Sequence, residues 1–186
     1  MVKVKSHLFT NTRYGSVSCV EKPCNGIATP TLQDFEQFIF NEVRCIDERQ
    51  WEKWLELFDE DGDYWIPLSS EDKTPRENLS IAYEDRAKLM LRCKRYSHPQ
   101  FHAQSPPSRS SHMVSNVMLD AAEDDVGEYL VHAQFTMREY RLEQRVDWAG
   151  TYSYRLRKNA ESFKIKRKKV LLVDSEAILE TIHVPI

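Results

Sequence analysis

The sequence predicts an α+β fold in which helices cover one face of a curved antiparallel sheet. Apolar residues recur at helical spacing between residues 30 and 96, whereas they alternate with polar residues in most of the second half. A period of 3.6 residues is typical of an amphipathic helix, and a period of two is typical of a half-buried strand. Because the helices are confined to the N-terminal half, they can cover only one face of the sheet. The other face must meet water or another subunit.

The chain has the size and composition of one folded domain. Of its 186 residues, 41% are hydrophobic and 11% are aromatic, which is enough for a packed core. The net charge of −3 gives no support for nucleic-acid binding, and no apolar run is long enough to span a membrane. The four cysteines form no C-x-x-C pair, so we expect free thiols and a cytoplasmic location. Residues 1–29 are expected to form a flexible arm, and residues 30–186 a single domain.

The first helix is expected to begin after Thr31. The Thr31 hydroxyl can accept from backbone N–H groups, and Asp34 follows three residues later, which is the pattern of a capping box. The residues that would form its apolar face are Leu32, Phe35, Phe38, Ile39, Val43 and Ile46.

Two further helices are expected before the strands. The second would end near Gly62, because glycine tolerates the positive φ of a helix end. Its apolar residues are Trp51, Trp54, Leu55 and Phe58. The third would run from about residue 83 to residue 96 and end at His98-Pro99. Its inward residues are expected to be Ala87, Met90 and Leu91.

A short strand is predicted at residues 64–68, followed by a loop at 69–80. Pro67 places this strand at a sheet edge or at its own end. Long strands follow, with turns near residues 123–127 and 158–161. The residues expected on the apolar face of two alternating strands are Tyr129, Val131, Ala133, Phe135, Met137, Val146, Trp148, Tyr152, Tyr154 and Leu156. Phe163, Ile165 and the run 170–173 are expected to form a last strand. The expected outward residues of the first long alternating strand are His132, Gln134, Thr136 and Arg138.

The most distinctive stretch is residues 104–117, which we call the signature segment. It reads QSPPSRSSHMVSNV and joins the helical half to the strands. It concentrates Arg109, His112 and Asn116 at the start of a strand, yet it contains no known reaction-centre motif. These three residues could fix the loop-to-strand junction or contact a neighbouring subunit, where arginine is a favoured anchor.

Motifs for phosphate binding and for metal centres are absent or incomplete. There is no P-loop and no G-x-G-x-x-G. Asp59, Asp61 and Asp63 resemble the start of a calcium loop, but Tyr64 stands where that loop requires glycine. His98 and His102 are four apart with Pro99 between them, so they do not form a convincing metal pair. The paired cysteines and histidines of a Rieske cluster are also missing.

Two other groups of residues leave alternatives open. A curved sheet closed by helices makes a cone, and a carboxylate–histidine pair inside it could act as a general acid and base. The candidates are Asp47, Asp63, His112 and His132. Histidines on strands more often satisfy local hydrogen bonds. The basic run at residues 164–169 could bind nucleic acid, protect a sheet edge or face an acidic partner.

Five ordered blocks resemble one family, the small (beta) subunits of aromatic-ring-hydroxylating dioxygenases. They are NEVRCIDER at 41–49, WEKWLELF at 51–58, DYWIP at 63–67, PPSRSSHMVSNV at 106–117 and FKIKRKKVLLV at 163–173. The resemblance implies a cone-shaped fold similar to nuclear transport factor 2 (NTF2). Residues 1–29 do not match the shared pattern, and the loop after Leu68 is short beside that of biphenyl-type members.

The resemblance also implies a division of labour between subunits. In this family the alpha subunit holds the Rieske [2Fe-2S] cluster and the mononuclear Fe(II), and the beta subunit forms a trimeric base in an α3β3 hexamer. Electrons come from NADH through a reductase and a ferredoxin. We therefore expect no catalytic, cofactor-binding or metal residue in this chain. The residues expected to act at a subunit interface or as structural signature are Trp65, Arg109, His112, Asn116 and Arg138. The alternative is a stand-alone dehydratase or isomerase of the same fold that uses Asp47 and His112.

Overall fold

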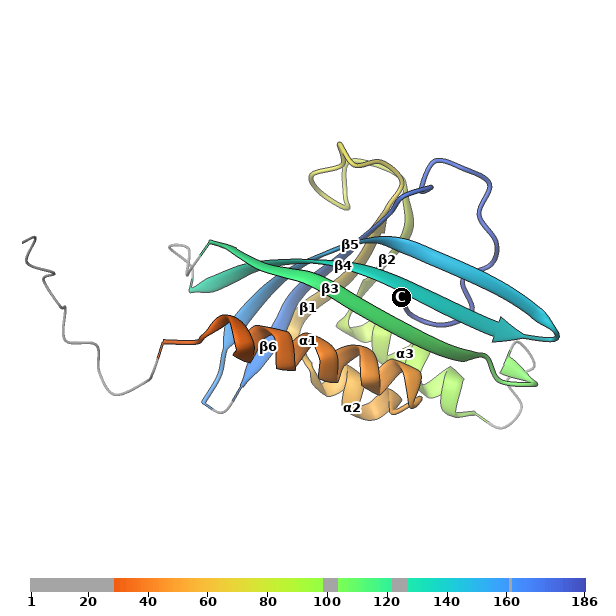
Figure 1. Cartoon of the computed structure of the whole chain (residues 1–186), viewed down its shortest axis with the longest axis horizontal. Coiled ribbons are helices and arrows are strands. Elements are labelled where there is room, and N and C mark those ends of the chain that lie inside the picture. The colour runs from red at the N-terminus through yellow and green to blue at the C-terminus, as the bar shows by residue number, and fades with distance from the viewer. Residues whose placement is uncertain (1–28, 99–103, 122–126, 161) are drawn as a thin grey trace, which may run out of the picture.

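A curved six-stranded sheet wraps around three helices in the part of the chain that is described (Figure 1). The structure is a computed structural model, and it describes residues 29–98, 104–121, 127–160 and 162–186. The strand order is β2-β1-β6-β5-β4-β3. All neighbours are antiparallel except β1 and β6, which run parallel. The predicted α+β class is confirmed. Residues 1–28 of the arm predicted at 1–29, residues 123–126 of the turn predicted at 123–127, and His102 lie outside the described residues.

Helix α1 (Leu32–Asp47) begins as the sequence predicts. Thr31 and Asp34 form the capping box, with the Asp34 carboxylate accepting from the Thr31 backbone N–H at 2.7 Å. The predicted apolar face is buried against the sheet, apart from Leu32 in the first turn, which stays exposed. This helix lies beneath β3 and supplies a large share of the core.

The second helix ends earlier than predicted. Helix α2 (Trp51–Glu56) has six residues, and β1 (Phe58–Pro67) follows almost at once. Gly62 therefore lies within a strand and does not end a helix. A Cβ atom there would lie 2.5 Å from the Ile165 carbonyl oxygen, so glycine permits a close approach of β6. Pro67 stands at the end of β1, but the strand is not an edge, because β2 and β6 flank it.

The third helix starts later than predicted, because its first residues form a strand instead. Strand β2 (Ser80–Asp85) pairs with β1, and α3 (Arg86–Ser97) follows with Asp85 as its cap. The predicted inward face was wrong: Ala87, Met90 and Leu91 are exposed. The buried residues are Leu89, Cys93 and Tyr96, which are spaced by four and three residues and make the stripe that packs inward.

Four long strands follow, and two of them have the alternation predicted from the sequence, although Val146 is only half-buried. The four strands are β3 (Arg109–Ala121), β4 (Glu128–Arg141), β5 (Gln144–Lys158) and β6 (Phe163–Leu172). The inward side chains predicted on β4 are buried, and Gln134, Thr136 and Arg138 on the opposite side are exposed. We call that opposite side the outer face of the sheet.

Asn116 produces a bulge in β3. Its φ of 52° lies in the left-handed region, which asparagine tolerates better than most residues. The pairing of β3 with β4 slips between Ser115 and Met118, so Asn116 adds a residue to the outer face and Val117 returns to the core.

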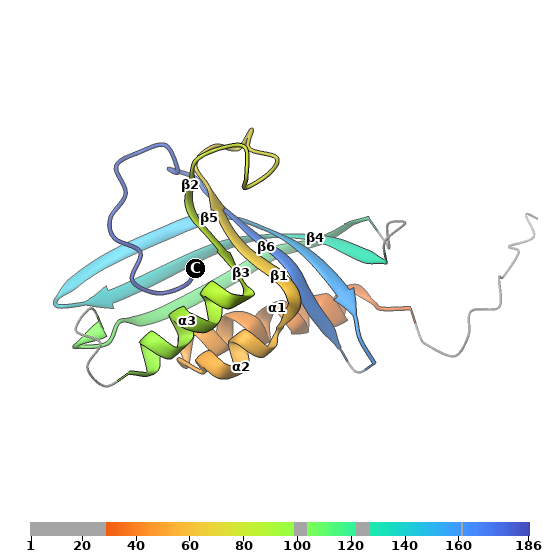
Figure 2. The same cartoon turned by 180° about the vertical axis from the view of Figure 1, so that it is seen from behind.

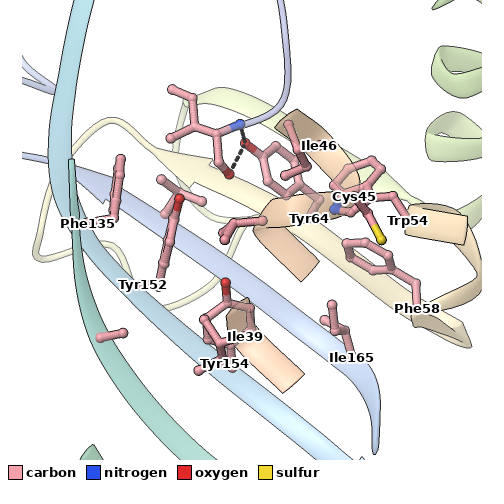
Figure 3. Packing of buried hydrophobic residues seen from close by; sticks show 14 of the residues in the cluster. Ile39, Cys45, Ile46, Trp54, Phe58, Tyr64, Phe135, Tyr152, Tyr154 and Ile165 are labelled. Atoms are coloured by element: carbon pink, nitrogen blue, oxygen red, sulfur yellow. Dashed lines mark hydrogen bonds between the residues drawn. The ribbon is translucent and has the colours of Figure 1, made fainter. Parts of the chain in front are cut away.

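Residues 173–186, which we call the C-terminal segment, return to the inside of the cone. Val184 and Ile186 are buried in the core. The Tyr64 hydroxyl accepts from the Ile186 backbone N–H at 3.1 Å and donates to its carbonyl oxygen at 3.2 Å (Figure 3). No sequence pattern predicted this contact. None of the helices in the described part of the chain is long and apolar enough to cross a membrane.

Candidate functional site

The five predicted signature residues do not gather at one place. Trp65 is buried and donates from its indole N–H to the Ser80 hydroxyl at 2.9 Å. The cationic groups of Arg167 and Lys169 lie over its ring, 5.8 Å and 4.5 Å from the centroid. Trp65 is thus buried outside the hydrophobic core cluster, whereas Trp51, Trp54 and Trp148 belong to that cluster, as their size favours.

Three of the five lie on the outer face of the sheet. The Arg109 guanidinium stacks 4.8 Å from the centroid of the Tyr140 ring, which is its partner on β4. The Asn116 amide donates to Gln134, also on β4, at 2.5 Å. Arg138 makes a two-pronged ion pair with Asp147, with N–O distances of 2.7 and 3.0 Å. Their assignment to a subunit interface stays a prediction.

His112 points into the cone and meets Asp47 at the end of α1. The imidazole Nδ1 lies 2.7 Å from Asp47 Oδ1, and the side chain is fully buried. Asp47 also accepts from the Ser110 hydroxyl at 2.7 Å and from the His112 backbone N–H at 2.9 Å. The signature segment therefore fastens α1 to the start of β3. Of the residues considered for a carboxylate–histidine pair, the structure brings these two together.

The other two candidates have different partners. Asp63 forms an ion pair with Arg167, and His132 lies 3.1 Å from Asp120. Asp59 and Asp61 pair with Arg157, so the acidic run Asp59–Asp61–Asp63 sits on β1 among cations. All three carboxylates thus lie on a strand.

The environment of Asp47 stabilises its charged form. Burial alone raises the pKa of the carboxyl group, but hydrogen bonds from His112 and Ser110 and the charge interaction with His112 together lower it below its usual value. With a proton on Nδ1 facing the Asp47 carboxylate, Nε2 of a neutral His112 carries a lone pair. That Nε2 is buried and has no hydrogen-bond partner among the described residues. A general base must reach its substrate, and this Nε2 is enclosed by the protein.

Replacing Asp47 by asparagine is expected to weaken the fold in a pH-dependent way. Because the folded pKa of Asp47 is lowered, its contribution is present above the unfolded pKa of about 3.9 and is lost as the pH falls through the folded value. We expect a loss of about 1–3 kcal/mol near pH 6 that shrinks as the pH approaches 3, measured by urea unfolding. The exposed Asp147→Asn change is the control and should have a smaller effect. A loss of unfolding free energy that does not vary with pH would contradict the proposed role of the Asp47 charge.

The signature segment also holds the C-terminal segment. The Gln104 amide donates to the His183 carbonyl oxygen at 2.8 Å and accepts from the Ser108 backbone N–H at 3.1 Å. The His183 imidazole in turn lies 3.3 Å from the buried Glu139 carboxylate. Sequence reasoning missed Gln104, Glu139 and His183, because residues 79 positions apart carry no local pattern that links them.

A buried ion pair lies deeper in the cone, between α1 and β6. Lys168 Nζ is 2.9 Å from both carboxylate oxygens of Glu42, and both side chains are fully buried. The same carboxylate accepts from the Trp54 indole N–H and from the Tyr154 hydroxyl. Burial lowers the pKa of the Lys168 ammonium group, and the Glu42 carboxylate opposes that shift.

The basic run at residues 164–169 is therefore divided between core and surface. Lys168 is internal, whereas Lys166 and Arg167 pair with Asp61 and Asp63. The edge-protection interpretation was wrong, because β6 lies between β1 and β5 inside the sheet. Most of the positive charge in this run is balanced by carboxylates of the same chain.

The described residues do not fit either iron group of the family. A Rieske cluster needs paired cysteines and histidines, and a mononuclear iron site needs two histidines and a carboxylate. Within the described ranges, no three His, Cys, Asp or Glu side chains gather where they could hold a metal ion. Cys45 and Cys93 are buried thiols, and burial raises the pKa of Cys93 to about 11.

Comparisons with known proteins agree on one family. The family model described as the ring hydroxylating beta subunit matches residues 41–178. The small subunit of 2-halobenzoate 1,2-dioxygenase from Burkholderia cepacia is 30% identical over 161 residues, covering 81% of this chain and 94% of the relative.

Solved structures extend the agreement to the fold. The beta subunit of benzoate 1,2-dioxygenase from Burkholderia mallei is similar with a TM-score of 0.69 and 26% identity, covering 84% of this chain and 99% of that one. An NTF2-like protein with a cystatin-like fold from Novosphingobium aromaticivorans has a TM-score of 0.54 at 12% identity, covering 76% of this chain and 81% of that one. The second likeness concerns the fold alone, and it agrees with the predicted cone.

Proposed function

The chain belongs to the ring-hydroxylating beta subunits, and from this membership we propose that it is the non-catalytic assembly subunit of an aromatic-ring dioxygenase. The observation that carries the proposal is the family match across residues 41–178, which includes the end of α1, both other helices and all six strands. The complete enzyme would insert both atoms of O2 into an aromatic ring during breakdown of aromatic compounds.

The chemistry of this enzyme would reside in a partner alpha subunit. That subunit would carry the Rieske [2Fe-2S] cluster and the mononuclear Fe(II), and it would receive electrons from NADH through a reductase and a ferredoxin. Three copies of each subunit would form an α3β3 complex in the cytoplasm. The beta chain would contribute a rigid base on which the alpha subunits are arranged.

The outer face of the sheet is the surface we propose for assembly. Met113 and Met118 on β3 are 71% and 57% exposed, and uncharged Gln134 and Thr136 lie beside them on β4. Methionine is enriched in protein interfaces, and uncharged side chains are favoured at their centre. Arg109, Asn116 and Arg138 lie on the same face, where they could extend the contact.

The Asp47–His112 pair favours one alternative, a stand-alone dehydratase or isomerase. Its Nε2 has no hydrogen-bond partner among the described residues, but it is buried, and the hydrogen bonds of Asp47 with Ser110 and with the His112 backbone give the pair a structural role. Turnover of a substrate by the isolated chain, lost in Asp47→Asn and His112→Ala, would favour the alternative over the assembly role.

Co-expression with the alpha subunit of the same organism tests the proposal. The beta chain is expected to copurify with an iron-bearing partner, and the alpha subunit alone should assemble poorly. Met113→Glu combined with Met118→Glu should reduce recovery of the complex by about tenfold or more, because charges would enter a desolvated contact. Met90→Glu on exposed α3 is the matched control and should leave recovery unchanged.

Two outcomes separate the parts of the proposal. A wild-type chain that never copurifies with the alpha subunit contradicts the assembly role itself. Normal recovery of the complex with both methionines replaced contradicts only the choice of the outer face.

A further inference from the structure

The C-terminal segment is held by few contacts where it returns to the cone. Figure 2 shows the end of the chain, marked C, beside α3. Two clefts, of about 340 and 240 Å³, are lined in part by this segment. Three hydrogen bonds join residues 178–186 to the rest of the described chain: one from Gln104 to the His183 carbonyl oxygen and two between Tyr64 and Ile186. A segment with so few contacts can open while the sheet stays folded.

A buried carboxylate, that of Glu139, faces this segment. Glu139 follows Phe135 and Met137 on the inward row of β4 and is 2% exposed. Neither of its carboxylate oxygens has a hydrogen-bond partner among the described residues. An ionised carboxylate that is buried without hydrogen bonds or a counter-charge is strongly unfavourable. The state of Glu139 therefore depends on the basic group nearest to it.

That basic group is His183, which belongs to the segment itself. Its Nδ1 lies 3.3 Å from Glu139 Oε1, and no other residue in the described ranges brings a basic nitrogen within ion-pair distance of Glu139. The His183 side chain is 28% exposed and lines the larger cleft, so it can exchange protons with water, from which Glu139 is shielded. With one proton between them, the two groups are an imidazolium beside a carboxylate or an imidazole beside a carboxylic acid. Without that proton, a bare carboxylate is buried under the segment.

The groups packed against Glu139 on the sheet do not supply another positive charge. On β3, Ser110 stands opposite Glu139 and donates to the Asp47 carboxylate, which is bonded to His112 in turn. The negative charge of Asp47 favours a proton on the Glu139–His183 pair. On β5 the residue opposite Glu139 is Val146, which has no charge.

On the other side, His183 faces α3 and β2. The titratable groups along the two clefts are Glu84, Lys88, Arg92, Arg95, Tyr96 and Glu180. The cations among them disfavour a positive imidazole, and the carboxylates favour it. These groups shift the pH at which the pair loses its proton, but they leave the direction of the effect unchanged.

We propose that Glu139 and His183 form a pH-sensitive latch for the C-terminal segment. At low pH the shared proton neutralises the buried carboxylate, and the segment stays closed against the cone. As the pH rises, the pair gives its proton to water, and the segment opens so that water reaches Glu139. Because the closed state binds one proton more than the open state, closure is favoured at low pH and weakened as the pH rises. The latch uses contacts within this chain, so it does not depend on the proposed assembly role.

Hydrogen–deuterium exchange of the full-length chain, followed by mass spectrometry, tests the latch. Protection is measured relative to the intrinsic exchange rate at each pH, because that rate itself rises with pH. The protection of residues 179–186 is expected to fall by about tenfold or more between about pH 6 and about pH 9, since opening releases a proton. Peptides from the middle of β5 should keep their protection, because the sheet stays folded.

Three variants separate the latch from a general effect of pH. Glu139→Gln removes the buried charge, so the protection of residues 179–186 should no longer depend on pH. His183→Lys keeps its positive charge at about pH 9, and the segment should remain protected there. His132→Gln is the matched control, because His132 also lies beside a carboxylate, that of Asp120, but nearer the surface. This control should show the same fall in protection as the wild type.

Two results would overturn the proposal. Protection of the wild-type segment that does not change with pH would show that no latch operates, and an undiminished fall in Glu139→Gln would show that the buried carboxylate is not its cause. Thermal unfolding at low pH checks that each variant is folded. If Glu139→Gln does not fold, His183→Lys decides, because a fall in its protection as large as that of the wild type contradicts the latch.

Discussion

Replacing Lys168 by methionine is expected to lower the free energy of unfolding by about 3–5 kcal/mol. The change removes the ammonium group that faces both oxygens of Glu42 and leaves a carboxylate in the core without its counter-charge. The Trp54 and Tyr154 hydrogen bonds cannot neutralise that charge. Lys168 Nζ also lies 4.4 Å from the centroid of the Tyr152 ring, so a cation–π contact is lost with it. Urea unfolding followed by circular dichroism measures the difference.

The neighbouring Lys166 provides the control for this experiment. Lys166 lies on the same strand and pairs with Asp61 near the surface, so Lys166→Met should cost no more than about 1 kcal/mol. Combining Lys168→Met with Glu42→Gln should recover part of the loss, because a neutral amide oxygen can still accept hydrogen bonds. If Lys168→Met costs no more than Lys166→Met, the buried pair does not stabilise the fold in the way described.

Replacing Gly150 by alanine is expected to cost about 3 kcal/mol. A Cβ atom at Gly150 would lie 2.1 Å from the Leu171 carbonyl oxygen and 3.0 Å from its carbonyl carbon. These are backbone atoms of β6, which pairs with β5 here, so no side-chain rotation can relieve the contact. The two central strands would have to separate at this point. The midpoint of urea unfolding should fall accordingly.

Thr151, the next residue on β5, supplies the comparison. Its side chain is exposed on the outer face, so Thr151→Ala should change the stability by no more than about 0.5 kcal/mol. An alanine at position 150 that is tolerated as well as one at position 151 would show that β5 and β6 can move apart at little cost.

The parts of the fold that were predicted correctly rest on local signals. The Thr31–Asp34 capping box lies within four residues, and the alternation of β4 repeats along one strand. The errors arose where a distant element decided the outcome. Gly62 reads as a helix end by itself, yet the approach of Ile165 places it in a strand. Strand β2 has no strong alternation of its own and is defined by its pairing with β1.

The residues of the candidate site were likewise predicted where the signal is local and missed where it depends on distant parts of the chain. The chemical types of Asp47 and His112 suggested a pair, but only the fold shows that α1 ends beside the start of β3. Gln104 and His183 are 79 residues apart, and Glu42 and Lys168 are 126 apart. The basic run at residues 164–169 does not reveal by itself that Lys168 points inward. That orientation depends on the pleat of β6 and on the Glu42 carboxylate in the core.

The parallel pairing of β1 with β6 has a consequence for the order in which the chain folds. Phe58 pairs with Ile165, so the strand that closes one side of β1 is synthesised long after α1 and α2. Trp54 and Phe58 are buried in the folded chain. Until β6 has been synthesised, their aromatic side chains stay exposed to water and can associate with other apolar surfaces. Such long-range closure is slow. A ribosome-bound chain therefore remains open along this seam through most of its synthesis, and it is then that chaperones would have their greatest effect on yield.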